Sequence, residues 1–326
     1  MTLPADFEEV ILNSDSGIRL LQLLENRVSP LGVSDLVRLR KEVGKEFTEA
    51  ALRISQSRRK AMGKLPFAEK LWLDSIRVEQ ATHQLIAAHK AKRFRGKPVI
   101  DVCCGVGGDT FSLASVACGL IAMDRDRDTL RRLRYNLKVL GLDQKVQLVL
   151  ADALRLCFDS QWHIHVDPDR RASNRQARPN FDIASYQPGP EVLLNLMKQC
   201  PGGAVKLSPA SDFAGFQSFA ADHGVQTEVE LLSFNGECRE ATLWFGNLAQ
   251  SDRRSATLLP SGYRFSGHGS QADLDRSIAP IQAGSKLLET DPALIRSGLA
   301  SEFADNIRAL PVVSDFSFLK VPEKCD

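Results

Sequence analysis

The stretch from Asp101 to Asp109, DVCCGVGGD, combines acidic residues and glycines between an apolar run and a helical pattern. Gly105 and Gly107 allow the backbone to turn tightly and to approach a ligand closely. Asp101 would repel a pyrophosphate but suits a cofactor that carries positive sulfonium and ammonium groups. Position 110, where the dinucleotide fingerprint requires a third glycine, holds a threonine. We therefore predict that this loop binds S-adenosylmethionine; a dinucleotide site and a purely structural turn are the weaker alternatives.

Two further acidic positions follow predicted strands, as an adenosine cofactor requires. Asp124 ends the next apolar run, 19 residues after Gly105, where a carboxylate can accept hydrogen bonds from both ribose hydroxyls. Asp152 and Ala153 end the third run, where a side chain can bond the adenine amino group and apolar neighbours can hold its ring. The carboxyl ends of parallel strands form the ligand crevice of open α/β sheets. Together with Asp109, which closes the glycine loop, these residues are candidates for cofactor binding.

The sequence DPDRR, residues 167–171, follows the fourth predicted strand, where a methyl acceptor would lie. Enzymes that methylate amino groups of planar bases carry an acidic or amide residue there, followed by two prolines and an aromatic ring. This chain keeps Asp167 and Pro168 but has Asp169 and Arg170 in place of the second proline and the ring. A guanidinium can stack on a base or grip a phosphate. Asp167, Pro168 and Arg170 are therefore candidate catalytic residues, and a nucleic-acid acceptor stays open.

The end of the fifth predicted strand carries Lys206 beside the same edge. A desolvated lysine can act as a base or hold a phosphate, and a structural salt bridge is the alternative. This strand end has no thiol, which disfavours uracil-C5 chemistry, because that reaction needs a cysteine nucleophile. Cys238, in the segment ECRE, has no histidine nearby in the sequence and is disfavoured as a nucleophile. We add Lys206 to the catalytic candidates and interpret Tyr186 as structural.

From residue 96 onward, strand-like runs alternate with helical patterns, which implies a parallel sheet with right-handed crossovers. The predicted strands are Pro98–Cys103, Gly119–Met123, Val146–Leu150, Trp162–Val166, Gly203–Leu207, Gln226–Ser233 and Ala241–Gly246. The predicted helices are Thr110–Ala117, Arg127–Leu140, Pro190–Cys200 and Phe213–His223. No helix separates the last two strands, so the seventh can insert antiparallel. The predicted fold is α/β, a doubly wound seven-stranded, Rossmann-like sheet in the order of class I methyltransferases.

The sequence divides into three regions. Residues 1–95 place apolar residues three and four apart, which predicts a small all-helical domain before the sheet. Residues 96–250 form the sheet domain, and residues 251–326 are a linker and a C-terminal extension that begins a small α+β module. Near the last boundary we predict a linker or exposed loop at Leu248–Ser270, a helix at Ser285–Arg308 and an extended segment at LPVVSDFSFLKV.

The net charge of +2 conceals a strongly basic segment. Between Arg53 and Lys97 there are twelve Lys and Arg residues against three Asp and Glu residues, a net charge of +9. Such a concentration attracts phosphate backbones, although most charge runs are solvated helix faces. Both interpretations stay open.

Composition excludes several classes of protein. Hydrophobic residues make up 43% of the chain and charged residues 25%, which is typical of globular proteins. No apolar run approaches the roughly 18–20 residues that cross a bilayer, and the N-terminus lacks a secretory signal. The seven cysteines include no CxxC pair, and His163 and His165 alternate along a strand. We therefore expect no disulfides, no metal site and a cytoplasmic location.

Longer motifs resemble known families. VIDVCCGVGGDTFSLA and IAMDRDRDTLRRLRYNLKVLGL resemble RNA-directed class I methyltransferases, including the cap-trimethylguanosine synthases. A bacterial methyltransferase family with a C-terminal THUMP-like domain is similar in SIRVEQATHQLIAAHKA, VDPDRR, VKLSPASD, NGECRE and ETDPALIRSGL, which stand here in that order. This resemblance implies cofactor contacts at Asp101, Cys103, Gly105, Gly107, Asp124 and Asp152. It also implies that Gln80 lies across the methionine end of the cofactor.

We expect an S-adenosylmethionine-dependent methyltransferase that acts on a tRNA or rRNA base by direct transfer, without a covalent enzyme intermediate. The sulfonium is an activated donor, so positioning and deprotonation of the acceptor supply most of the catalysis. One alternative is a methyltransferase for a small acidic molecule or a protein, held by Arg170 and Arg171. Another is a non-catalytic RNA-binding protein that retains the fold. Because the chain ends at Asp326, we expect the THUMP-like module to be truncated or absent.

Overall fold

Two compact units make up the chain. A computed structural model describes residues 5–27, 31–156, 158–169, 183–250, 254–269 and 278–322. The first unit consists of residues 1–96 and 104–152, and the second of residues 97–103 and 153–326. The boundary between the units therefore falls inside the glycine-loop motif, between Cys103 and Cys104.

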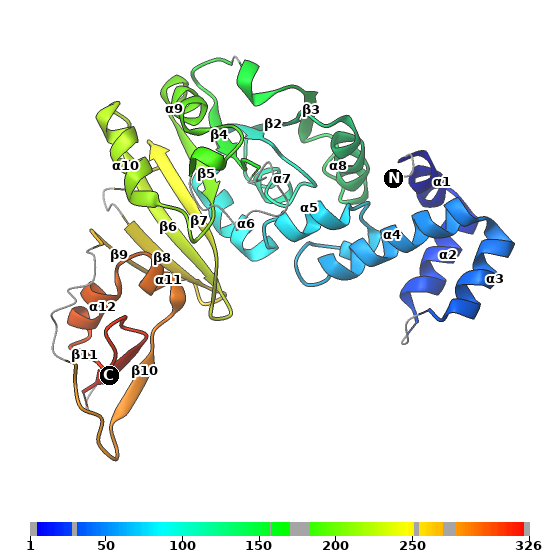
Figure 1. The fold of residues 1–326 in the computed structure, drawn as a ribbon. Coiled ribbons are helices and arrows are strands. Elements are labelled where there is room, and N and C mark those ends of the chain that lie inside the picture. Colours follow the sequence, from blue (N-terminus) through cyan, green and yellow to red (C-terminus); the bar gives the residue numbers. More distant parts are fainter. Residues whose placement is uncertain are drawn as a thin grey trace. The chain divides into compact units, whose positions relative to one another are not determined.

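The N-terminal part of the first unit is helical (Figure 1, blue to cyan). Its elements are α1 (Ala5–Asn13), α2 (Asp15–Glu25), α3 (Val33–Val43), α4 (Lys45–Ala61), η1 (Ala68–Lys70), α5 (Ser75–Gln80), α6 (Gln84–Ala91) and η2 (Lys92–Phe94). Apolar residues at helical spacing form a buried core that includes Ile11, Leu21 and Ile54. Asp74 begins α5 by accepting hydrogen bonds from two backbone N–H groups. The predicted all-helical region before the sheet is confirmed.

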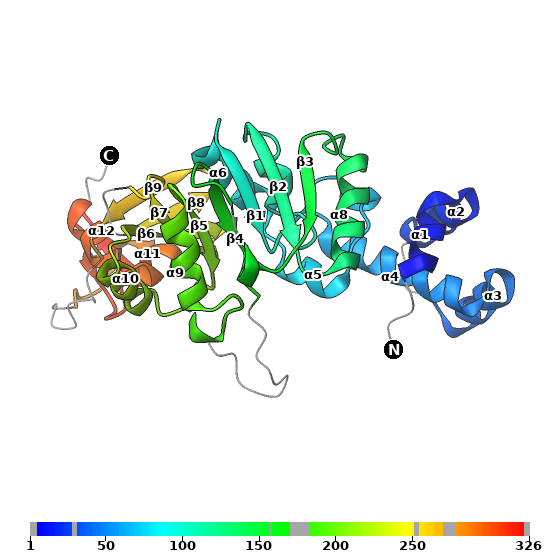
Figure 2. The same ribbon diagram turned by 90° about the horizontal axis from the view of Figure 1, so that it is seen from above.

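A strand pair and two helices complete the first unit. They are α7 (Thr110–Leu113), β2 (Gly119–Asp124), α8 (Arg127–Val139) and β3 (Val146–Leu150). β2 and β3 run parallel, and α8, which connects them, packs against both (Figure 2). Asp126 begins α8 as its N-cap, and the helix buries Leu130, Leu133 and Leu137 on one face. This face fixes α8 on the strand pair.

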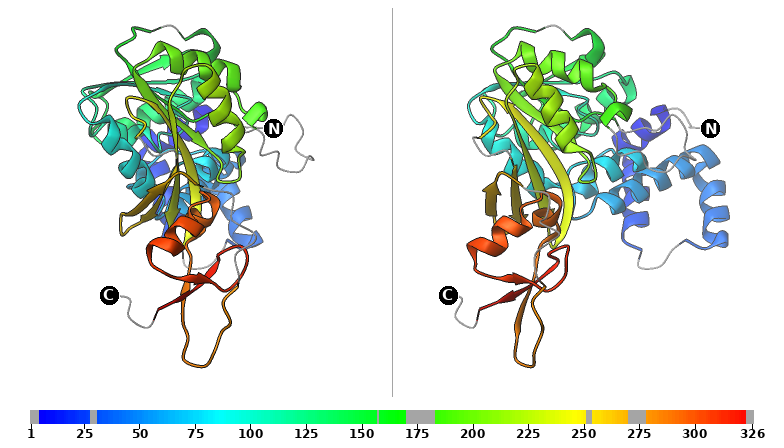
Figure 3. Two further views of the ribbon diagram at one scale, coloured as in Figure 1. Left: turned by 90° about the vertical axis from the view of Figure 1, so that its left-hand side faces the viewer. Right: turned by 60° about the vertical axis from the view of Figure 1, so that its left-hand side comes forward.

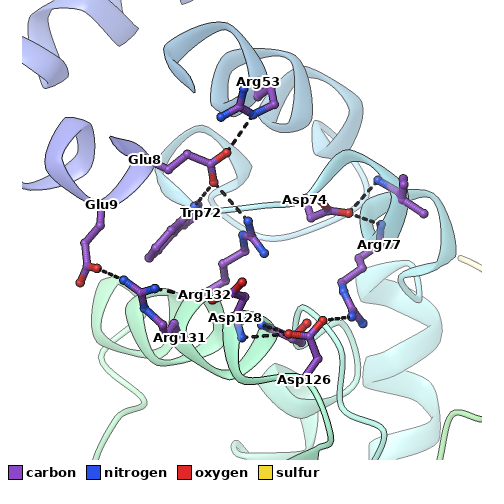
Figure 4. Close-up of polar contacts among 12 residues, drawn as sticks. Glu8, Glu9, Arg53, Trp72, Asp74, Arg77, Asp126, Asp128, Arg131 and Arg132 are labelled. Carbon is purple, nitrogen blue, oxygen red and sulfur yellow. Dashed lines mark hydrogen bonds and ion pairs between the residues drawn. The ribbon is translucent and has the colours of Figure 1, made fainter. Parts of the chain in front are cut away.

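A buried carboxylate ties α1 to α8. Glu8 accepts hydrogen bonds from Trp72 Nε1 at 2.7 Å and Arg53 Nε at 3.1 Å, and it lies 3.3 Å from Arg132 Nη2. Figure 4 shows these side chains, which come from α1, α4, α8 and the loop before α5, meeting around one carboxylate. A buried charge needs such partners because burial otherwise disfavours it. Polar contacts therefore add to apolar packing in holding the helical region to α8.

The second unit contains most of the larger sheet. Its strands are β1 (Pro98–Val102), β4 (His163–Val166), β5 (Gly202–Leu207), β6 (Thr227–Phe234), β7 (Glu237–Gly246), β8 (Arg254–Leu259) and β9 (Tyr263–Gly267), in the order β1-β4-β5-β7-β6-β8-β9. β1, β4 and β5 run parallel, and β7 is antiparallel to both β5 and β6. Helices α9 (Pro190–Gln199) and α10 (Phe213–Asp222) connect its strands. With β2 and β3, the sheet has nine strands among the described residues. The predicted α/β fold with an antiparallel seventh strand is confirmed.

The prediction of a linker or exposed loop at Leu248–Ser270 is wrong, because this stretch contains β8 and β9. β8 pairs in parallel with β6, and β9 pairs antiparallel with β8. Ser255 and Thr257 of β8 are fully buried, since their hydroxyls donate to Glu228 at 2.9 Å and Glu230 at 2.6 Å on β6. Polar composition suggested exposure, but these side chains find their partners on another strand.

Residues 278–322 form a small second sheet with two helices (Figure 3, orange to red). β12 (Phe318–Val321) lies between β10 (Lys286–Glu289) and β11 (Leu310–Pro311), antiparallel to both. Helices α11 (Pro292–Arg296) and α12 (Ala300–Asn306) lie between β10 and β11 in the chain. The predicted helix Ser285–Arg308 is wrong at its start, where β10 forms, because a short apolar run fits a strand as well as a helix.

Candidate active site

The glycine loop has a backbone that only glycine adopts without strain. Gly105 and Gly107 have φ angles of 55° and 98°. A Cβ on Gly107 would lie 2.6 Å from side-chain atoms of both Phe111 and Leu133. The loop is therefore packed closely against α7 and α8, and a side chain at position 107 would push it out of place.

Asp124, the predicted ribose ligand, ends β2 and faces this loop. Its side chain is buried, and it accepts hydrogen bonds from the N–H groups of Gly105 at 3.1 Å and Asp126 at 3.0 Å. The carboxylate thus joins the glycine loop to the turn that begins α8. Within the first unit, the structure brings Gly105, Gly107 and Asp124 together.

Asp109, the residue that closes the loop, has two buried partners. Thr82 Oγ1 donates to Asp109 Oδ2 at 2.6 Å, and Lys90 Nζ lies 2.8 Å from Oδ1. The Lys90 and Asp109 side chains are 2% and 7% exposed. The contacts of Thr82 and Lys90 with Asp109 were not predicted from the sequence, because helical periodicity does not reveal which loop a buried lysine meets.

Gln80 and Asp152 are the remaining candidates in the first unit. Gln80 is the exposed last residue of α5, and Asp152 is half-buried after β3. Two residues beyond Gln80, the backbone of Thr82 packs on the glycine loop: a Cβ on Gly108 would lie 3.0 Å from Thr82 N. The segment that carries Gln80 is therefore placed against the loop.

In the second unit, Asp101 in β1 pairs with a histidine. His165 Nδ1 lies 2.8 Å from Asp101 Oδ1, and both side chains are buried. The two residues are register partners in β1 and β4, so their side chains leave the same face of the sheet. From the sequence, His165 was considered only as a metal ligand and set aside. The register of two strands that lie apart in the chain identifies it as the partner of Asp101.

Two other cofactor candidates in the second unit have distinctive positions. Cys103 follows β1 with a φ of 60°, a left-handed conformation that is rare for residues other than glycine. Strained backbone of this kind concentrates at functional sites. Ala153 begins the turn η3 (Ala153–Arg155) and is buried, whereas Leu154 beside it is 64% exposed. This exposed apolar side chain, which can cover a flat ring, was not identified from the sequence.

The two catalytic candidates Asp167 and Lys206 meet at the ends of β4 and β5. Lys206 Nζ lies 2.8 Å from Asp167 Oδ2, and the side chains are 11% and 32% exposed, respectively. Asp167 N donates to Val102 O, which continues the pairing of β1 and β4 by one residue. The carboxylate is therefore held on one side by a nearly buried ammonium and remains one-third exposed to solvent.

Backbone contacts fix the rest of this edge. Pro168 is buried, and Asp169 exchanges two backbone hydrogen bonds of 2.9 Å with Gln187. Tyr186 is buried, and its hydroxyl accepts a hydrogen bond from Ser208 N at 2.9 Å. This supports the structural interpretation of Tyr186. Arg170 and Arg171 lie outside the described residues.

Cys238 lies near the start of β7 and is unsuited to nucleophilic attack. Burial raises the pKa of its thiol to about 12. The thiol is therefore protonated at neutral pH, whereas the thiolate is the reactive form.

Part of the basic charge between Arg53 and Lys97 is neutralised within the protein. Among the described residues at least five of its cations form ion pairs: Arg53–Glu8, Arg58–Glu25, Lys60–Glu79, Arg77–Asp126 and Lys90–Asp109. Lys92 and Arg95, near the end of the segment, are exposed. The charge that can reach a phosphate is thus smaller than +9 and includes these two residues.

Two general features are absent from the described ranges of the chain. No group of three or more His, Cys, Asp or Glu side chains there is arranged to hold a metal ion. In the same part of the chain, no helix is long and apolar enough to cross a membrane.

A mostly parallel sheet, a glycine loop after its first strand and acidic residues after the next strands define the class I methyltransferases. The chain is 32% identical over 254 residues to an uncharacterized S-adenosylmethionine-dependent methyltransferase of Mycobacterium tuberculosis, a match that covers 76% of this chain and 66% of the relative. Over most of its length the chain is therefore similar to a family of S-adenosylmethionine-dependent methyltransferases. It spans about 66% of the length of these curated relatives.

Further similarities concern parts of the chain or its fold. Residues 96–182 match the sequence model of a family described as RNA cap guanine-N2 methyltransferase. Ribosomal RNA small subunit methyltransferase B of Pseudomonas syringae is 40% identical over 90 residues, which is 27% of this chain and 19% of that protein. A crystal structure assigned to a methyltransferase from Porphyromonas gingivalis has a TM-score of 0.69 with 18% identity, covering 100% of this chain and 80% of that one. The last similarity concerns the fold alone.

Proposed function

We propose that this protein transfers a methyl group from S-adenosylmethionine to a base of tRNA or rRNA. The observation that carries the proposal is the Asp167–Lys206 pair at the ends of β4 and β5. Asp167 belongs to the DPDRR segment, where related enzymes hold the amino group that they methylate. The same segment lies within residues 96–182, which match the RNA cap guanine-N2 family.

The residues that we assign to the cofactor fit S-adenosylmethionine chemically. Gly105 and Gly107 have positive φ angles, and the close packing of Gly107 against Phe111 and Leu133 leaves no room for a side chain there, which supports a tight turn around the cofactor. We assign ribose binding to Asp124, adenine to Asp152 and Ala153 with Leu154, and the methionine end to Asp101, Cys103 and Gln80. S-adenosylmethionine supplies an activated methyl group when it is bound. Asp109 closes the loop that holds it.

Asp167 would accept a hydrogen bond from the exocyclic amino group of the base. This bond would orient the lone pair of the amino nitrogen for attack on the methyl group. Once the amino nitrogen has taken the methyl group, with S-adenosylhomocysteine as the other product, the Asp167 carboxylate would accept the surplus proton of the amino group and pass it to water. Lys206 keeps this carboxylate in place. Pro168 stiffens the turn, and we assign Arg170 to stacking on the base or holding its phosphate. Positioning and proton acceptance are sufficient for direct transfer.

Two surface features support an RNA acceptor. Lys92 and Arg95 are exposed on the basic segment, and such residues bind phosphates. Phe67 has a left-handed φ of 51° and is 60% exposed, beside Met62 in a cavity of about 350 Å³. An exposed aromatic ring is a stacking platform for an unpaired base.

The domain assignment is part of the proposal. We infer a helical domain at residues 1–95, a methyltransferase domain at 96–250 and a C-terminal extension at 251–326, which contributes β8 and β9 to the sheet of the methyltransferase domain. The sheet β10-β12-β11 with α11 and α12 suits the α+β module that the resemblance associates with a THUMP-like domain. We also infer a cytoplasmic location, where RNA substrates are found.

Transfer of labelled methyl from S-adenosylmethionine into total RNA, followed by nucleoside analysis, tests the proposal. A labelled tRNA or rRNA nucleoside is the expected result. Label that resists nuclease and enters protein or small molecules would support the alternative acceptor. Binding of RNA without binding of S-adenosylmethionine would identify a non-catalytic RNA-binding protein.

A further inference from the structure

Asp109 occupies the N-cap position of α7, yet its side chain does not cap that helix. An aspartate at this position normally accepts hydrogen bonds from backbone N–H groups of the first turn. Here the carboxylate turns toward Thr82 Oγ1, at 2.6 Å, and Lys90 Nζ, at 2.8 Å. Thr82 and Lys90 belong to the α5–α6 region, so the end of the glycine loop is tied to residues that lie 27 and 19 positions earlier in the chain.

Lys90 is an unusual anchor, because its side chain is only 2% exposed. A buried ammonium is disfavoured by desolvation and persists only where a carboxylate is well placed to pair with it. Paired in this way, Lys90 fixes the direction of the Asp109 carboxylate. A fixed carboxylate holds the Thr82 hydroxyl in one position.

Thr82 in turn lies directly on the loop. A Cβ on Gly108 would come within 3.0 Å of Thr82 N and 3.2 Å of Thr82 O. The neighbouring Gly107 packs against Phe111 and Leu133. The glycine loop therefore contacts Thr82 at Gly108 and two apolar side chains at Gly107, and moving Thr82 would remove the first of these contacts.

The segment Ser75–Gln84, which contains Thr82, is also fixed at other points. Arg77 Nη2 pairs with Asp126 Oδ2 at 2.7 Å, as Figure 4 shows, and Asp126 caps α8 two residues after Asp124. Lys64 Nζ donates to the carbonyls of Val78 and Glu79 at 2.8 Å each, at the end of α5. The segment thus connects both loops of the first unit that we assign to the cofactor.

We propose that Thr82, Asp109 and Lys90 form a positioning triad that holds the Ser75–Gln84 segment on the glycine loop and thereby sets the affinity for S-adenosylmethionine and its product. The triad acts through the loop backbone and through the placement of Gln80. The inference rests on the proposed function, since it concerns the same cofactor site.

Thr82→Val tests the triad with the least disturbance, because it removes one hydroxyl and leaves the Lys90–Asp109 pair intact. We expect it to weaken S-adenosylhomocysteine binding by about five- to tenfold in isothermal titration. In the ligand-free protein, amide hydrogen exchange should become faster in peptides covering residues 78–84. Thr82→Ser, which keeps the hydroxyl, should restore both readouts.

Thr48→Val is the matched control, because the Thr48 hydroxyl is also buried but donates to Gly44 O within α4, away from the loop. It should bind S-adenosylhomocysteine like the wild type. Lys90→Met should weaken binding more than Thr82→Val, but it leaves the buried Asp109 carboxylate without its positively charged partner and can unfold the protein. Thr82→Val therefore decides the question.

Thr82→Val with wild-type affinity and wild-type exchange would overturn the triad while leaving the proposed function in place. Equal loss of affinity in Thr48→Val would show a general effect of lost stability and would also overturn it. If the wild-type protein itself did not bind S-adenosylhomocysteine, the proposed function would fail first and the triad with it.

Discussion

Lys206 Nζ and Asp167 Oδ2 lie 2.8 Å apart, across the ends of two adjacent parallel strands. The lysine is nearly buried and the carboxylate is one-third exposed, so the pair presents a fixed acceptor oxygen to solvent. Asp167→Asn removes the proton acceptor but keeps the shape of the side chain. We expect methyl transfer to fall about a hundredfold or more, with S-adenosylhomocysteine affinity changed by less than about twofold.

Lys206→Met serves as the companion variant of Asp167→Asn. It frees the carboxylate without removing it, so methyl transfer should fall less than in Asp167→Asn. Labelled-methyl incorporation and titration calorimetry measure the two effects separately. Loss of cofactor affinity in step with activity would argue against an acceptor role for this pair.

The Asp101–His165 pair predicts a change in the affinity for S-adenosylmethionine. Asp101→Asn removes a buried negative charge that we assign to the positive methionine end, while its amide can still bond His165. We expect S-adenosylmethionine affinity to fall about tenfold or more, as for the loss of a charged hydrogen-bond partner. The exposed Asp143→Asn changes the net charge equally and should leave the dissociation constant unchanged. Equal dissociation constants for Asp101→Asn and Asp143→Asn would refute the assignment of Asp101 to the methionine end of the cofactor.

Cys238 should be dispensable for the reaction. Because burial raises the pKa of its thiol to about 12, the reactive thiolate is scarce at neutral pH. We expect Cys238→Ala to retain methyl transfer within about twofold and to show no trapped enzyme–RNA adduct on denaturing gels. A large loss of activity with an unchanged unfolding midpoint would instead indicate covalent catalysis.

His163 predicts a pH dependence of stability. Burial lowers its pKa below the ordinary value of 6.5, outweighing its hydrogen bond to Asn247. Among the described residues Nδ1 has no hydrogen-bond partner, so protonation there adds an unsatisfied donor. The unfolded chain then binds a proton more readily than the folded one. The neutral His163 side chain therefore makes its full contribution to the free energy of unfolding above pH 6.5. This contribution is lost as the pH falls toward the lowered pKa of His163 in the folded protein.

Urea unfolding of wild type and His163→Gln at pH 7.5 and pH 5.5 measures this effect. The wild type should lose more stability than the variant between the two pH values, since glutamine does not titrate. An equal loss in both proteins would show that other groups cause the dependence.

Lys92 and Arg95 predict a salt effect on RNA binding. The double variant Lys92→Ala/Arg95→Ala should weaken RNA binding and reduce the slope of log K against log salt by about one to two units. Lys41→Ala/Lys45→Ala removes two exposed charges outside the basic segment and serves as the control. An unchanged slope in the first variant would place the RNA elsewhere.

The sequence by itself determined the order of strands and helices and the positions at which acidic residues follow strands. Asp101, Asp124, Asp152 and Asp167 could be placed because the alternation of apolar runs and helical patterns is local along the chain. The same local rules failed where polar side chains are buried. Ser255 and Thr257 suggested a loop, although the carboxylates of Glu228 and Glu230 make their burial favourable.

Only the tertiary structure decided which side chains meet. The pairs Asp101–His165 and Asp167–Lys206 depend on strand register, and the contacts of Asp109 with Thr82 and Lys90 depend on helix packing. A buried charge must find its partner at a distance of about 3 Å, whereas periodicity specifies only the face on which it lies. The sequence thus determined the class of cofactor loop, and packing over long separations in the chain decided how its acidic residues are held.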